Sequence, residues 1–266
     1  NFWRMIWEHK VEIIVMVTGL IEGWKQKCTR YWPEHVLGKV VNGTETGAIE
    51  YGDISVATIS SKSFGSFVLT VLRATGPDVN NPDQELTRDI KHFWYETWPD
   101  HGVPMKTDMK TMDTESFIGF HAKIAETPKK IQTSPTLVHC SAGVGRTGTY
   151  IGMDIAMDTA NGNELPVIKD IVTKMRQFRM FAVQQFIQYE FLNTCIMGFL
   201  KSDKKYTSIL TQVDHWKKVT DRGYKVNQTE TGRLFYIKDG VSTWDVPNAS
   251  APALANGVPE VVTPKK

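Results

Sequence analysis

The stretch "TLVHCSAGVGRTGTY", residues 136–150, constrains the fold of this chain more than any other. It joins a short apolar run, which predicts a strand, to a helical pattern that begins near Thr147. Glycines and small residues between the two allow the backbone to curl so that successive N–H groups point inward, and such a nest binds anions. The N-terminus of the following helix adds its dipole at the same place. The stretch therefore predicts an anion-binding loop between a strand and a helix.

Two side chains make this loop chemically reactive as well as anion-binding. Arg146 offers a planar fork that can clamp two phosphate oxygens at once. Cys140 lies at the head of the same positive field, and such surroundings lower a thiol pKa from about 8.5 to roughly 3.5–7.5. Thr147 can donate a hydrogen bond to the sulfur and so tune it as a leaving group. The alternative interpretation is an inert buried thiol, because a bare Cys–x5–Arg spacing is a weak signal, whereas the whole of "HCSAGVGRTG" is specific.

Composition and charge narrow the class of protein. The chain has 266 residues, 41% of them hydrophobic and 23% charged, which is typical of a globular protein. A net charge of +2 favours neither a nucleic-acid binder nor a membrane-surface protein, and no apolar run approaches the roughly 18 residues that a membrane helix needs. Cys28, Cys140 and Cys195 are too few and too scattered for a disulfide framework, so we expect a reducing, cytoplasmic (intracellular) compartment.

The order of strand and helix patterns predicts the fold class. Strands are expected at residues 13–18, 52–64, 67–74, 89–98 and 136–139, and helices at about 108–126, 147–160, after Pro166, and at about 184–200. Strands followed by helices indicate an α/β (α+β) domain with a mixed twisted sheet flanked by helices, ending near residue 201. The polar residues 202–221 are expected to form a linker. The Ala-, Pro-, Asn- and Gly-rich residues 249–266 are expected to be a disordered tail.

Five ordered motifs in residues 1–200 agree with the loop. "NFWRMIWE", "IVMVT", "KCTRYWP", "HFWYETWPDHGVP" and "MRQFRMFAVQQFIQY" resemble, with the loop itself, the successive motifs of the cysteine-dependent protein tyrosine phosphatases. The resemblance implies hydrolysis of phosphotyrosine in proteins through a phosphocysteine intermediate, with no metal and no organic cofactor. It also implies an amino-terminally incomplete domain, since the family pattern begins upstream with the loop that recognises the phenol ring.

Breaking a tyrosine phosphate ester also requires a proton for the departing phenolate. Asp100 in "WPDHGVP" is the expected general acid, on a proline-bracketed loop that the resemblance implies closes over substrate. The alternative is an ordinary turn aspartate. Hydrolysis of the phosphocysteine needs a positioned water, and the resemblance assigns this role to Gln184, with Gln188 second. Glutamines on a helix are otherwise more often solvated surface, and Gln185 stands where the family commonly has threonine.

The resemblance alone assigns supporting and substrate-binding roles to further residues. Glu22 would pair with Arg146, and Lys27 would contact the closed acid loop, although an ordinary surface charge pair is the alternative. The phosphate-loop residues expected to bind substrate are Ser141, Ala142, Gly143, Val144, Gly145 and Arg146. His139 would orient the loop and adjust the acidity of the thiol, and Arg176 and Arg179 would support the loop from behind.

The carboxy-terminal residues 222–248 have a different character. Three short strand-like runs separated by "NQTETG" and "KDG" predict a small all-β, three-stranded module that resembles a WW domain. The resemblance implies that Phe235 and Trp244 bind proline-rich peptides. Tyr224 replaces the family's first tryptophan, unless Trp216 serves across a longer loop, and the second hairpin is short, so an incidental β-hairpin extension is the alternative. For the whole chain, the alternatives to an enzyme are an inactive phosphotyrosine-binding protein and an adaptor that acts through the WW-like module.

Overall fold

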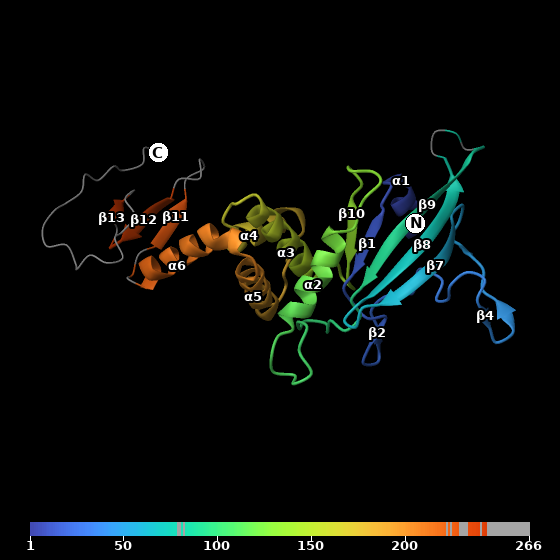
Figure 1. Ribbon diagram of the computed structural model, residues 1–266, viewed down its shortest axis with the longest axis horizontal. Coiled ribbons are helices and arrows are strands. Elements are labelled where there is room, and N and C mark those ends of the chain that lie inside the picture. The colour runs from blue at the N-terminus through green and yellow to red at the C-terminus, as the bar shows by residue number, and fades with distance from the viewer. Residues whose placement is uncertain are drawn as a thin grey trace, which may run out of the picture. The chain divides into compact units, whose positions relative to one another are not determined.

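The computed structural model describes residues 1–78, 81, 83–221, 223, 225–228, 234–239 and 241–243 (Figure 1). Two compact units divide the chain. The first comprises Asn1–Thr159 and Pro166–Phe199, and the second comprises Ala160–Leu165 and Leu200–Lys266.

A six-stranded mixed sheet forms the centre of the first unit, in the order β10-β1-β9-β8-β7-β6 (Figure 1). Its strands are β1 (Ile13–Met16), β6 (Ile49–Glu50), β7 (Ser55–Ser63), β8 (Val68–Pro77), β9 (Glu85–Trp94) and β10 (Thr136–His139). The short β1 is paired in parallel with both β9 and β10, and the remaining neighbours are antiparallel. All four residues of β1 are buried, as expected for a strand covered on both faces. Two small hairpins flank the sheet: β2 (Ile21–Glu22) with β3 (Lys25–Gln26), and β4 (Val40–Val41) with β5 (Thr44–Glu45).

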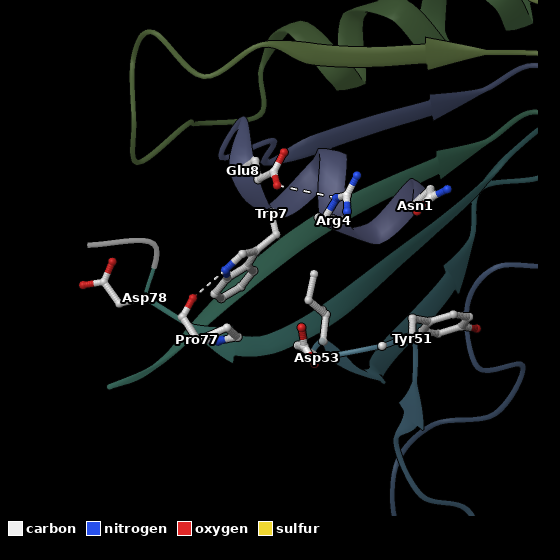
Figure 2. Close-up of a pocket in the computed structure, with 10 residues that line it drawn as sticks. Asn1, Arg4, Trp7, Glu8, Tyr51, Asp53, Pro77 and Asp78 are labelled. Atoms are coloured by element: carbon white, nitrogen blue, oxygen red, sulfur yellow. Dashed lines mark hydrogen bonds and ion pairs between the residues drawn. The ribbon is translucent and has the colours of Figure 1, made fainter. Parts of the chain in front are cut away.

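Helix α1 (Phe2–Glu8) covers one face of the sheet. Its buried residues Trp3, Ile6 and Trp7 pack with Ile14 and Leu72 in one apolar cluster. The Trp7 indole donates to the Pro77 carbonyl at 2.8 Å, which fixes the helix against the end of β8 (Figure 2).

The opposite face carries helices α2 (Thr114–Ala125), α3 (Gly145–Asn161), α4 (Ile168–Phe178) and α5 (Phe186–Ser202). Side chains alternate between faces along a strand, so Phe93 points away from the α1 cluster that contains Ile90. The rings of Phe93, Phe117, Phe120 and Tyr150 contact one another edge to face or in offset stacks. This aromatic core holds α2 and α3 on the sheet, and α3 in turn carries the phosphate loop at its N-terminus.

The predicted bounds differ most from the structure at helix α2 and strand β9. Helix α2 begins at Thr114 rather than near residue 108, because Asp108 accepts hydrogen bonds from the backbone of Lys110 and Thr111 in a turn. Met109, which lies within the residues 108–126 expected to be helical, is 75% exposed with a φ of 54°. Strand β9 spans Glu85–Trp94 rather than residues 89–98, and the residues after it form the predicted acid loop.

The second unit begins with helices where the sequence predicted a linker. Residues Lys204–Tyr206 form a 3-10 turn, η1, and Thr207–Asp221 form α6. Tyr206 and Ile209 are buried, and the Tyr206 hydroxyl donates to Asn161 Oδ1 at 2.7 Å. These two buried residues anchor a segment that is otherwise polar.

Strands β11 (Lys225–Gln228), β12 (Leu234–Lys238) and β13 (Val241–Thr243) form an antiparallel sheet in that order. Phe235 belongs to β12, whereas Trp244 and the predicted disordered tail lie outside the described residues. Within the described part of the chain, no helix is both long and apolar enough to cross a membrane.

Candidate active site

The predicted anion-binding loop runs from the end of β10 to the first turn of α3. Gly143 has a φ of 68°, a left-handed conformation that glycine adopts without strain and that turns the loop. Arg179 fixes the loop from outside, donating from Nε to the Gly143 carbonyl and from Nη2 to the Ala142 carbonyl, each at 3.0 Å. Because these carbonyls point outward to accept from Arg179, the N–H groups of the loop are available on its inner side.

The Cys140 thiol lies at the base of this loop and is 7% exposed. Burial raises the pKa of the thiol, but hydrogen bonding from Thr147, Val144 and Gly143 outweighs burial and leaves the pKa below its ordinary value. The Thr147 hydroxyl is itself buried and has no partner of full hydrogen-bond geometry among the described residues. It is therefore free to turn toward a thiolate, which is the form of cysteine that attacks.

A chain of hydrogen bonds holds the loop from below. His139 Nδ1 lies 3.1 Å from the Cys140 carbonyl and Nε2 lies 2.7 Å from the Tyr31 hydroxyl, which lies 2.8 Å from His92 Nε2. A carbonyl only accepts, so Nδ1 of His139 carries a proton. Burial lowers the pKa of His139, so its neutral ring leaves Nε2 to accept from Tyr31. The Tyr31 oxygen then accepts from His92, and every donor in the relay has a partner.

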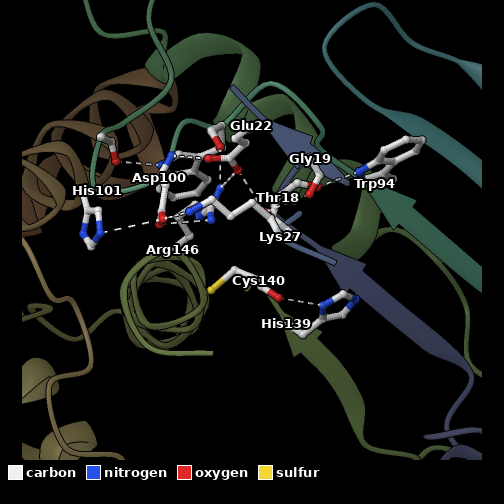
Figure 3. Close-up of polar contacts among 12 residues, drawn as sticks. Thr18, Gly19, Glu22, Lys27, Trp94, Asp100, His101, His139, Cys140 and Arg146 are labelled. Atoms are coloured by element: carbon white, nitrogen blue, oxygen red, sulfur yellow. Dashed lines mark hydrogen bonds and ion pairs between the residues drawn. The ribbon is translucent and has the colours of Figure 1, made fainter. Parts of the chain in front are cut away.

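Arg146 is the centre of a charge network and is 1% exposed (Figure 3). Its Nη1 donates to Glu22 Oε1 and, at 2.8 Å, to the Trp98 carbonyl, while Nη2 donates to Asp100 Oδ1 at 3.1 Å. Lys27 Nζ donates to the other oxygen of Asp100 at 2.5 Å. Glu22 lies on β2 and Lys27 follows β3, so one small hairpin positions both the arginine and the acid loop.

The acid loop is drawn in over the phosphate loop in this arrangement. Asp100 also donates its backbone N–H to Glu22 Oε2 at 2.9 Å, and the Trp98 indole closes the loop on the Gly102 carbonyl at 2.9 Å. Burial raises the pKa of Asp100, but the hydrogen bond from Lys27 and the charge of Arg146 lower it by more than burial raises it. The pKa of Asp100 therefore lies below the ordinary value. Asp100 is therefore a carboxylate that partly neutralises Arg146.

The glutamine segment packs directly on the first turns of α3. A Cβ placed on Gly145 would lie 2.8 Å from Gln188 Oε1 and 3.3 Å from Gln184 Cβ. Gln188 is 1% exposed and Nε2 donates to the Gly102 carbonyl at 3.4 Å, whereas Gln184 is exposed. The structure thus brings both glutamines beside the phosphate loop, with Gln188 linked to the acid loop.

The sequence led us to expect that Arg176 supports the phosphate loop, but its hydrogen bonds go elsewhere. It donates to the carbonyls of Ala182 and Val183, and so holds the segment before the glutamines. Val183 has a φ of 58°, which is strained for a β-branched residue and is maintained by this anchoring. Sequence reasoning also missed the relay residues Tyr31 and His92, although each lies within a quoted motif, "KCTRYWP" and "HFWYETWPDHGVP", that could have pointed to it.

Gln185, which departs from the family pattern, is another residue whose contact the sequence did not indicate. Its side-chain amide lies 3.3 Å from His101 Nδ1 and so bridges to the acid loop. Glu22 and Lys27, by contrast, contact the groups that the family resemblance implied, Arg146 and the acid-loop Asp100 respectively. The site as a whole combines a thiol of lowered pKa with an arginine and, opposite them, a carboxylate. These three groups suit nucleophilic attack on an ester of a tetrahedral anion.

Known proteins share both the sequence and the fold of this chain. The family described as "Protein-tyrosine phosphatase" matches residues 1–198. The chain belongs to the protein-tyrosine phosphatase family. Receptor-type tyrosine-protein phosphatase eta from Mus musculus is 36% identical over 205 residues, which cover 77% of this chain and 15% of that protein. Tyrosine-protein phosphatase non-receptor type 9 from Rattus norvegicus is 30% identical over 210 residues, covering 76% of this chain and 33% of the relative.

A solved phosphatase structure supports the same assignment. The crystal structure of the catalytic domain of human protein tyrosine phosphatase non-receptor type 18 matches with a TM-score of 0.59 and 28% identity. The match covers 74% of this chain and 63% of the other. The chain thus spans a small part of the length of its receptor-type relatives, and the family assignment rests on its first 198 residues.

Proposed function

We propose that this chain hydrolyses phosphotyrosine in proteins through a phosphocysteine intermediate. The observation that carries the proposal is the convergence of Cys140, Arg146 and Asp100 in one site, with the thiol pKa lowered and both charges held by named partners. The three cysteines are unpaired, which fits the reducing cytoplasm in which we expect the protein to act.

In the first step the Cys140 thiolate attacks phosphorus. The loop N–H groups and Arg146 bind the equatorial oxygens, where charge accumulates in the transition state. Asp100 protonates the departing phenolate. The dianionic substrate raises the pKa of this carboxyl and competes with it for Arg146 Nη2, so substrate binding prepares the acid that the ligand-free network keeps ionised.

In the second step a water attacks the phosphocysteine. Asp100, now ionised, accepts a proton from the water, and Gln184 positions it, with Gln188 supporting from beside Gly145. Thr147 donates to the departing sulfur and stabilises it as a thiolate. Positioning and charge stabilisation by these groups account for both steps without a metal or an organic cofactor.

Hydrolysis of a phosphotyrosine peptide tests this proposal. Cys140→Ser should abolish turnover while phosphopeptide still binds, and Cys28→Ser is the matched control because Cys28 lies outside the loop. Asp100→Ala should lower kcat by about 10²–10⁴-fold, the usual contribution of a general acid. Robust turnover by Cys140→Ser would exclude the thiol as nucleophile, and equal activity on phosphoserine peptides would exclude tyrosine specificity. A wild-type chain that binds phosphotyrosine peptide without turnover would instead favour the inactive binding protein.

A second candidate function concerns the carboxy-terminal sheet, and the antiparallel order β11-β12-β13 favours it. We propose that this WW-like module binds proline-rich peptides through Phe235 and Trp244. A proline-rich peptide array probed with wild type and Trp244→Ala tests the idea. Binding that is absent, or that Trp244→Ala leaves unchanged, would remove it.

A further inference from the structure

One contact between the acid loop and the glutamine segment has no role in the chemistry proposed above. Gln185 Nε2 lies 3.3 Å from His101 Nδ1. His101 directly follows Asp100, and its other ring nitrogen, Nε2, lies 3.8 Å from Asp100 Oδ2 (Figure 3). In the described part of the chain, these two residues are the polar partners of the His101 ring. The imidazole therefore lies between the expected general acid and a residue that departs from the family pattern.

The hydrogen bond between Gln185 and His101 has one direction. An amide nitrogen only donates, so Gln185 donates to Nδ1 of His101, and Nδ1 carries no proton. A ring that accepts at Nδ1 carries its proton on Nε2, which is the nitrogen that faces the Asp100 carboxylate. Gln185 thus decides which side of the imidazole is presented to Asp100.

The backbone of Gln185 is firmly held. Its N–H donates to Gln188 Oε1 at 3.2 Å, and its carbonyl accepts from the N–H groups of Gln188 and Tyr189 in the first turn of α5. Gln188 is 1% exposed, so this framework is buried. The amide that reaches His101 is therefore carried by a rigid part of the protein.

The backbone of His101, by contrast, is in an unfavourable conformation. Its φ is 58°, in the left-handed region where residues other than glycine are uncommon. The side chain is 61% exposed, so packing does little to hold the residue there. A strained conformation persists only where the surrounding contacts maintain it. We therefore expect the hydrogen bond from Gln185 to maintain this one.

We propose that Gln185 is a positioning residue that holds the acid loop closed over the phosphate loop through its hydrogen bond to His101. The inference rests on the proposed function, in which the closed loop brings Asp100 to the substrate. Lys27 and Glu22 hold this loop from the β2–β3 hairpin, and Gln185 holds it from the start of α5. Without Gln185 the loop is closed for a smaller fraction of the time, while the phosphate loop is unchanged.

Gln185→Met, which keeps the length of the side chain and removes its donor, tests the proposal on two esters. A phosphotyrosine peptide needs a proton for its leaving group, whereas a dinitrophenyl phosphate releases a phenolate that needs none. One neutral hydrogen bond changes an equilibrium by about 2–10-fold, so kcat/KM for the peptide should fall by about fivefold and that for the dinitrophenyl ester by less than about twofold. Gln177→Met, exposed on α4, is the matched control and should act as wild type does. An equal loss on both esters, or no loss on either, would overturn the proposal.

A double variant shows whether the contact itself is responsible. His101→Phe removes the acceptor, so adding Gln185→Met to it should lower kcat/KM no further. Losses that multiply in the double variant would mean that the two residues act independently, and the positioning role would be wrong.

Amide hydrogen exchange at Asp100 gives a measurement that needs no turnover. The Asp100 N–H bonds to Glu22 while the acid loop is closed, so Gln185→Met should speed its exchange by about fivefold. Unchanged exchange would overturn the positioning role. A wild-type chain that hydrolyses neither ester would refute the proposed function instead, and the exchange measurement would still decide the role of Gln185.

Discussion

A single methyl group added at Gly148 should slow the proposed reaction, although it would contact the backbone of Ala182 and Val183 and no reacting atom. A Cβ placed there would lie 2.5 Å from the backbone N of Val183 and 3.1 Å from the Cα of Ala182. Both contacts are to backbone, so the segment must retreat by roughly 0.9 Å to reach an ordinary 3.4 Å contact. That segment leads directly into Gln184, and displacements of about 1 Å in positioning groups can cost about 10²-fold in rate.

Gly148→Ala should therefore lower kcat by about 100-fold, and overpacking should cost about 1–3 kcal/mol of stability. The loss should fall on the second step, because Gln184 positions the water while Cys140 keeps its surroundings. Rapid-quench kinetics on an aryl phosphate should show a burst of phenol followed by slow turnover. Gly119→Ala is the matched control, since Gly119 is exposed in α2 with no atom within 4 Å of the added Cβ. That control should gain about 0.5–1 kcal/mol. A folded Gly148→Ala enzyme with wild-type steady-state turnover would refute the reasoning.

Three further predictions follow from the groups around the thiol. Thr147→Val removes a hydroxyl that lowers the pKa of Cys140, so iodoacetamide alkylation should shift to higher pH; an unshifted profile would contradict this. Tyr31→Phe removes the donor to His139 and should lower the free energy of unfolding in urea by about 1–3 kcal/mol, while Tyr51→Phe should change it little. Burial, and next the charge of His139, lower the pKa of His92 from 6.5 to about 3, so the unfolded chain takes up a proton that the folded chain refuses. The stability due to neutral His92 is present above pH 6.5 and is lost as pH falls toward 3; His92→Gln should flatten this loss, and an equally steep loss would be evidence against it.

Local patterns predicted the phosphate loop well and the longer-range supports poorly. The strand over residues 136–139 has the predicted bounds, and α3 begins at Gly145, two residues before the predicted start, because apolar runs and glycines act within a few residues. The relay from His92 through Tyr31 to His139 joins residues 61 and 108 positions apart. No periodicity or motif within one element encodes such a contact, so it becomes visible only when β1, β9 and β10 lie side by side.

The difference between the two arginines, of which only Arg179 supports the loop as predicted, has a specific cause. Helix α4 ends at Phe178, and Arg179 takes an extended conformation with a φ of −136°. The helical Arg176 therefore points along α4 to the carbonyls of Ala182 and Val183, whereas Arg179 turns out of the helix toward the phosphate loop. The sequence placed both residues in the right segment, but the helix end decides which one reaches the loop, and helix ends are the least certain part of any pattern.

The hydrogen-bond relay beneath the loop has one polarity, imposed from the Cys140 carbonyl outward. A proton moving along it would have to reverse every bond at once, and the first reversal would set a lone pair of His139 against that carbonyl. The relay therefore does not pass a proton between the two histidines and the backbone of the nucleophile; it holds that backbone in place. Thiol reactivity should consequently follow a single ionisation, with no histidine step superimposed near neutral pH.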